Sequence, residues 1–167
     1  MGETFHIISD GSCDLPTTLT QEKNITVVPF YVSFDEEHYL KETVDIAVRD
    51  FYQMMVDKKG VYPKSSMPSI QDYAEVFRPF AENDIPVICI CITTKFSGSL
   101  QSAQNAKELV LEKYAEARIT VLDSTVDTVY RVSSFWKQSV CGITASAITM
   151  PSHGLTPSKV PAESFLP

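Results

Sequence analysis

A hydroxyl-rich turn follows a buried strand in the middle of the chain, and its residue types suit the binding of an anion. Residues 87–92 form an unbroken apolar run, which is typical of a strand buried on both faces of a parallel sheet. Thr93 and Thr94 come next, then residues 96–99 (F-S-G-S), and then helix formers over 100–117. Free backbone N–H groups and the positive end of the helix dipole meet at such a helix start. The turn could therefore hold an anion, or its serines could only cap the helix.

Similar side chains follow other predicted strands. Residues 9–12 (S-D-G-S) come after the apolar run 5–8, residues 123–125 (D-S-T) close another strand, and a loop carries Ser65 and Ser66. Because ligands of open α/β sheets bind at the carboxyl ends of the strands, we expect these groups to converge on one crevice. The candidate supporting residues of this site are Asp10, Ser12, Ser66, Thr93, Thr94, Gly98, Ser99, Asp123 and Ser124.

The pattern of metal-ligand residue types does not indicate a metal site. None of the four cysteines forms a C-x-x-C pair, and Cys89 and Cys91 are expected to be core residues on one face of a strand. Asp10 and Asp14 could be a metal pair, but aspartates in such turns more often act as caps, and Asp14 is the candidate N-cap of a helix ending near Lys23. We expect neither a metal nor a cofactor.

The elements that must position these groups alternate between strand and helix. Strands are predicted over residues 5–8, 25–34, 87–92 and 118–123, and helices over 15–23, 44–58, 70–82 and 100–117. Pro29 cannot donate to a strand ladder, so the second strand must lie at an edge or bend there. Residues 60–69 are expected to be a loop stiffened by Pro63 and Pro68, with Ser69 capping the next helix. This alternation predicts an α/β fold whose mostly parallel sheet has helices on both faces.

Composition limits the class of protein further. The 167 residues are enough for one domain with a core, and the 44% hydrophobic and 21% charged content is ordinary for a globular chain. The formal net charge of −7 argues against a nucleic-acid partner. The N-terminus lacks the regions of a signal peptide, and no apolar run approaches 18 residues. We therefore expect a cytoplasmic protein without integral membrane association.

Several segments, taken together and in order, resemble the DegV family of bacterial fatty-acid-binding proteins. Residues 63–69 (P-K-S-S-M-P-S) are similar to the family's P-K-T-S-Q-P-S, and residues 93–103 (T-T-K-F-S-G-S-L-Q-S-A) to its S-S-x-L-S-G-T-Y-Q-S-A. The segments that carry the resemblance are residues 9–16, 27–29, 51–55, 63–69, 93–103 and 121–124. Each motif alone is weak, but their order over residues 4–128 is specific.

The resemblance implies a carrier and not a self-sufficient enzyme. Family members enclose a long-chain fatty acid, and several are the binding subunit of a bacterial fatty acid kinase whose separate ATP-dependent subunit phosphorylates the carboxyl group. Two hydroxyl groups hold that carboxylate in the family, one from each of the two motifs quoted above. The matching residues here are Ser65 and Ser97, with serine replacing the family's threonine at the first position.

Residues 129–167 depart from this resemblance. They contain only four charged residues and are rich in Ser, Thr and Pro. Family members continue with a glycine-containing turn, an amphipathic helix and a second domain that closes over the lipid, and with permitted codons a neighbouring reading frame can encode such a pattern. We therefore expect a DegV-like domain over residues 1–128, an out-of-frame and poorly ordered tail over 129–167, and no second domain. Resequencing the gene around the Thr128 codon tests this.

Two other functions remain open on the residues alone. A serine hydrolase could use Ser97 as its nucleophile, but His6, His38 and His153 stand in no recognisable relation to it and the G-x-S-x-G turn is absent. A domain that binds a phosphate compound could use the same helix start, but the chain lacks a glycine-rich P-loop with its lysine.

Overall fold

The computed structural model describes residues 5–125 of the chain. The elements follow one another as β1 (His6–Asp10), the short 3-10 helix η1 (Gly11–Cys13), α1 (Thr17–Glu22), β2 (Ile25–Val28), β3 (Tyr31–Ser33), β4 (Leu40–Lys41), α2 (Val48–Asp57), β5 (Lys64–Ser66), α3 (Ile70–Glu82), β6 (Val87–Cys91), α4 (Ser99–Leu111) and β7 (Ile119–Asp123). The predicted domain boundary and tail over 129–167 lie outside the described residues.

The larger sheet is parallel and has the strand order β2-β1-β6-β7. Successive residues of a strand point to opposite faces, so neighbours in β1 pack into different parts of the core. Ile8 belongs to the cluster that α3 and α4 cover, together with Tyr73 and Phe77, whereas Ile7 packs on the opposite face with Cys13. Parallel order and two buried faces are what the apolar run in β6 predicted.

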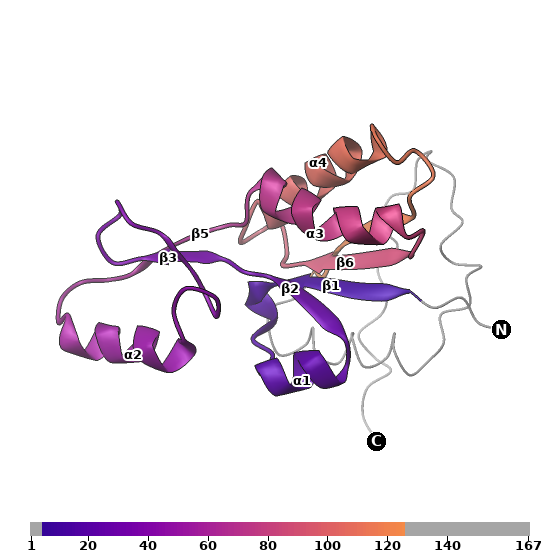
Figure 1. The fold of residues 1–167 in the computed structure, drawn as a ribbon. Helices are drawn as coiled ribbons and strands as arrows, with labels where there is room; N and C mark the ends of the chain where they lie inside the picture. Colours follow the sequence, from indigo (N-terminus) through magenta and orange to yellow (C-terminus); the bar gives the residue numbers. More distant parts are fainter. Residues whose placement is uncertain (1–4, 126–167) are drawn as a thin grey trace, which may run out of the picture.

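Helices lie on both faces of this sheet. Figure 1 shows α3 and α4 side by side on one face and α1 on the other. Ser69, directly before α3, forms the predicted cap: its side chain accepts a hydrogen bond from the Asp72 N–H, and the Asp72 side chain accepts one from the Ser69 N–H. The predicted α/β class with a mostly parallel sheet is confirmed.

The single strand predicted over residues 25–34 is wrong. The chain forms two strands, β2 in the parallel sheet and β3 in a separate antiparallel sheet of order β4-β3-β5. The break falls at Pro29, which has no N–H, and at Phe30, whose N–H donates to the Glu42 carboxylate at 2.8 Å instead of to a neighbouring strand. Figure 1 shows the small sheet and α2 projecting from the larger part of the molecule.

The loop predicted over residues 60–69 contains a strand. β5 pairs antiparallel with β3, with Ser65 opposite Val32 and Ser66 opposite Tyr31. The short run K-S-S between two prolines has no alternation of apolar and polar residues, so local sequence gave no strand signal. Pairing with a distant segment makes this strand.

Helix ends differ in detail from the prediction. Asp14 does not cap α1: the N-cap is Pro16, and Asp14 adopts a left-handed conformation (φ 48°) that closes η1. α2 starts at Val48, not near residue 44. α4 begins after Gly98 and ends at Leu111, not near residue 117. No helix within residues 5–125 is long and apolar enough to cross a membrane.

Candidate functional site

A cavity of about 570 Å³ lies where the carboxyl ends of β1 and β6 meet the small sheet. This volume falls within the usual range for small-molecule sites, about 300–1,000 Å³. Its lining residues come from the turn after β1, the end of β6 and the turn before α4, and from the small sheet: Gly11, Ser12, Asp14, Phe30, Val32, Glu42, Ser65, Ser66, Met67, Ile92, Phe96, Ser97 and Gly98.

Ser65 and Ser97 are the candidate carboxylate-binding residues, and both line this cavity. Ser65 lies in the small sheet, whereas Ser97 lies in the turn between β6 and α4. Ser65 is held by the pairing of β5 with β3. The Ser97 oxygen accepts a hydrogen bond from the Ser99 N–H at 3.1 Å, which leaves its own hydrogen able to donate to a ligand. The structure therefore gives the two hydroxyl groups a common cavity, and their role in binding stays a prediction.

Asp10 lies beneath the cavity floor and fixes the position of the turn. It is fully buried, and one carboxylate oxygen accepts hydrogen bonds from the Ile92 N–H and from the Ser99 hydroxyl, each at 2.8 Å. The other oxygen accepts one from the Ser12 hydroxyl at 2.6 Å. One side chain thus joins the end of β1, the end of β6 and the first residue of α4.

A buried tyrosine extends this network into the core. The Tyr73 hydroxyl lies 2.6 Å from the Ser99 oxygen, and because Ser99 donates its hydrogen to Asp10, Tyr73 donates to Ser99. Burial raises the pKa of Tyr73, so this phenol stays protonated and remains a donor. The network connects α3 to the start of α4 through polar groups that are all buried.

The remaining candidate supporting residues fall into two groups. Ser12, Ser66 and Gly98 line the cavity, and Ser99 supports it from below. Thr93, Thr94, Asp123 and Ser124 do not line it. Instead the Thr94 hydroxyl donates to the Asp123 carboxylate at 3.1 Å, and the Ser124 N–H donates to the Cys91 carbonyl at 3.0 Å. The strand ends therefore converge only in part, and any role of this second group in binding stays a prediction.

The charged residues that line the cavity are both acidic. Glu42 is half-buried and accepts a hydrogen bond from the Phe30 N–H, and Asp14 is exposed. Burial raises the pKa of Glu42, and the nearby Asp14 and Asp10 carboxylates raise it further. No lysine or arginine is among the described lining residues. Among residues 5–125, the lining groups that could donate to an anion are hydroxyl and backbone N–H groups.

Two residues at or near the cavity, Glu42 and Asp72, were not predicted from the sequence. Glu42 lies in a polar segment without periodicity, and its place beside Gly11 depends on the fold of the small sheet. Asp72, which was not among the candidate residues, accepts hydrogen bonds from the Tyr31 hydroxyl at 2.9 Å and from Lys41 Nζ at 2.8 Å, and these bonds tie the small sheet to α3. The capping-box spacing S-x-x-D was the one available signal for Asp72.

The described histidines do not support a hydrolase. His6 lies 2.8 Å from the Thr26 hydroxyl and stacks on Phe80, and His38 pairs with Asp35 on the surface. Neither lines the cavity, so the described residues give Ser97 no histidine base. His153 lies outside the described residues. The absence of a described lysine or arginine at the cavity likewise does not favour a site for a phosphate compound.

A parallel α/β sheet with a hydroxyl-lined cavity at its carboxyl edge has the arrangement in which open α/β folds commonly bind ligands. The chain belongs to the DegV family: the family model, described as "Uncharacterised protein, DegV family", matches residues 4–130. This confirms the resemblance on which the sequence interpretation rests.

Relatives of known sequence or structure are about twice as long as this chain. A DegV domain-containing protein of Clostridium acetobutylicum is 32% identical over 157 residues, which cover 94% of this chain and 51% of that protein. A fatty acid (stearic acid)-binding protein from Eubacterium ventriosum superposes with a TM-score of 0.81 at 43% identity, over 87% of this chain and 50% of the other. A fatty-acid-binding DegV family protein from Thermus thermophilus gives 0.68 at 26%, over 89% and 51%.

Proposed function

We propose that this chain binds a long-chain fatty acid and holds its carboxylate between Ser65 and Ser97. The observation that carries the proposal is that these two hydroxyl groups, far apart in sequence, line the same cavity at the carboxyl edge of the parallel sheet. The structures to which the chain is similar include a stearic-acid-binding protein at 43% identity, which supports the same class of ligand.

The physical chemistry of the cavity is consistent with an acid that carries an acyl chain. Each charge-assisted hydrogen bond to a carboxylate contributes about 1.5–3 kcal/mol, and the start of α4 favours a negative charge nearby. Apolar side chains such as Phe30, Val32 and Phe96 stand next to the hydroxyl groups. Burial of the acyl chain contributes about 0.8 kcal/mol per methylene group and would dominate the affinity.

The carrier role extends the proposal. We infer from the family resemblance that the bound carboxylate is presented to a separate, ATP-dependent fatty acid kinase subunit, and that this chain performs no catalysis of its own. The chain spans about half the length of the relatives it matches, so the role of the whole protein stays a proposal.

Mass spectrometry of the chain as purified tests the proposal. A co-purified fatty acid in the wild-type chain, depleted in the double variant Ser65→Ala/Ser97→Ala, is the expected result. The matched control is Thr18→Ala, which removes an exposed hydroxyl group on α1 and should leave the bound lipid unchanged. A bound phosphate compound in place of lipid, or equal lipid in the double variant and the control, would contradict the proposal.

A further inference from the structure

Glu42 is an acidic residue in a cavity that is proposed to bind an acid. Two hydrogen bonds fix its position: its backbone N–H donates to the Phe30 carbonyl at 3.0 Å, and its side-chain oxygen accepts the Phe30 N–H at 2.8 Å. It also packs against Gly11, where a Cβ atom would collide with the Glu42 carboxylate. Its side chain is therefore held in the cavity wall and is not an exposed surface acid.

The charge of Glu42 is not balanced by a cation within residues 5–125. No described lysine or arginine forms an ion pair with it, and its neighbour Lys41 is engaged with Asp72 at 2.8 Å. Two further acidic groups act on it, Asp14, which also lines the cavity, and the buried Asp10. A ligand head group in this cavity consequently meets several hydroxyl groups and the Glu42 carboxylate.

The hydroxyl donors cannot distinguish a carboxylate from a phosphate, because both accept hydrogen bonds in the same way. Repulsion from a fixed negative charge does distinguish them, because it roughly doubles when the head group carries two charges instead of one. Partial burial strengthens this difference, since the effective dielectric constant is lower than in water.

We propose that Glu42 is a specificity-determining residue, which makes the cavity accept a singly charged carboxylate and reject a doubly charged phosphate head group. The inference rests on the proposed fatty-acid function and adds a difference in affinity between the free acid and its phosphorylated form. An acyl chain that has received a phosphoryl group would bind more weakly than the free acid, so the phosphorylated product would leave the cavity more readily.

Competition binding with the 167-residue chain tests this selectivity. Hexadecanoic acid and hexadecyl phosphate, below their aggregation concentrations and at a pH where the phosphate is doubly charged, compete with a fluorescent fatty acid. The wild type is expected to prefer the carboxylic acid about tenfold. In Glu42→Gln, whose amide oxygen can still accept the Phe30 N–H, hexadecyl phosphate should gain about tenfold in affinity and the acid about threefold.

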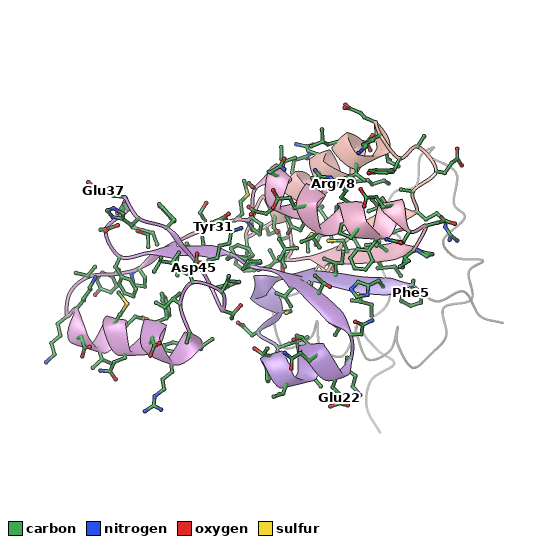
Figure 2. All side chains as sticks on the ribbon, viewed as in Figure 1. Phe5, Glu22, Tyr31, Glu37, Asp45 and Arg78 are labelled. Carbon is green, nitrogen blue, oxygen red and sulfur yellow. The ribbon has the colours of Figure 1, made fainter. Side chains whose placement is uncertain are left out.

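Glu37→Gln is the matched control, because it removes the same charge from an exposed position at the far end of the projecting part (Figure 2). This control should keep the wild-type ratio, and Glu42→Asp should retain most of the selectivity. Binding of hexadecanoic acid with an unchanged ratio in Glu42→Gln would overturn the role of Glu42 and leave the proposed function intact. Failure of the wild type to bind either compound would overturn the proposed function and this inference with it.

Discussion

Asp10 shows how one residue can organise a site without lining it. Its carboxylate holds the Ser12 and Ser99 hydroxyl groups and the Ile92 N–H, so the turn that carries Ser97 is fixed by a group below the cavity. The sequence placed Asp10 among the candidates because it follows a strand, but not in this role. The contacts join residues 82 and 89 positions apart in sequence, which a local pattern does not encode.

Replacement of Asp10 by Asn is expected to destabilise the fold by about 2–4 kcal/mol. The amide has one acceptor oxygen where the carboxylate has two, so a buried donor is left unsatisfied. Urea denaturation measures the change. Asp57→Asn, which removes an exposed carboxylate that accepts one side-chain hydrogen bond, should change stability by less than about 0.5 kcal/mol. Equal stability of the two variants would show that Asp10 is not a structural anchor.

Two glycines at the cavity should respond differently to an added methyl group. In Gly11→Ala the new Cβ atom collides with the Glu42 carboxylate and lies 3.2 Å from the Phe30 backbone nitrogen. We therefore expect the free energy of unfolding to fall by about 1–3 kcal/mol. In Gly98→Ala it lies 2.8 Å from Met67 Sδ, and this flexible side chain can move aside at a cost below about 1 kcal/mol. Thermal or urea unfolding of both variants gives the comparison, and the reverse order would contradict the packing described.

At the scale of elements, the site depends on how the small sheet meets the parallel sheet. Figure 2 shows Tyr31 on β3, near the place where the projecting part joins α3. There the Asp72 carboxylate accepts hydrogen bonds from Tyr31, from Lys41 and from the Ser69 N–H. Because β5 pairs with β3, this junction also sets where Ser65 lies relative to Ser97.

Asp72 gives the junction a pH dependence with a definite sign. Burial opposes ionisation, but hydrogen bonds from Lys41, Ser69 and Tyr31 outweigh it and lower the pKa of Asp72 from 3.8 to about 2. A lowered pKa in the folded state stabilises the fold above pH about 4, and the contribution is lost as the pH falls towards 2. The free energy of unfolding of Asp72→Asn should therefore be about 1–3 kcal/mol lower than that of the wild type at neutral pH. Between about pH 4 and about pH 2 it should fall less steeply than that of the wild type.

Urea denaturation at several pH values measures this effect. The control is Asp50→Asn, because Asp50 is an exposed acid that also lies in the first turn of a helix but has no place in the junction. Its removal tests the helix-dipole contribution alone, which is typically below about 1 kcal/mol. If the stability of Asp72→Asn falls between about pH 4 and about pH 2 as steeply as that of the wild type, the assignment of this pH dependence to Asp72 is refuted.

The sequence predicted the parallel sheet better than the small sheet, and the reason is physical. Strands such as β6 are buried on both faces and read as apolar runs, and their order relative to the helices restricts the topology. β4 and β5 are short and largely exposed, so no hydrophobic pattern marks them. Pro29 correctly indicated that the strand is interrupted at this position, but it did not indicate that a second sheet begins there.

At the scale of the whole molecule, the projecting part exposes many of its large apolar side chains. The chain spans about half the length of the relatives it matches, and several large apolar side chains on the projecting part are exposed. The most exposed are Val44 (68%), Val48 (56%), Tyr52 (61%), Val56 (63%) and Tyr62 (83%). Such exposed apolar side chains on one part of a molecule are typical of a surface that contacts another segment or ligand.

The central claim is that the hydroxyl groups of Ser65 and Ser97 bind one carboxylate head group. A double-mutant cycle in fatty-acid binding tests this claim most directly. Equilibrium titration of the wild type, Ser65→Ala, Ser97→Ala and the double variant with the same fatty acid gives both the single effects and their coupling. We expect each single variant to weaken binding about tenfold or more, with non-additive effects because both hydroxyl groups contact one carboxylate. Unchanged affinity in Ser97→Ala, with the fold intact by circular dichroism, would contradict the account.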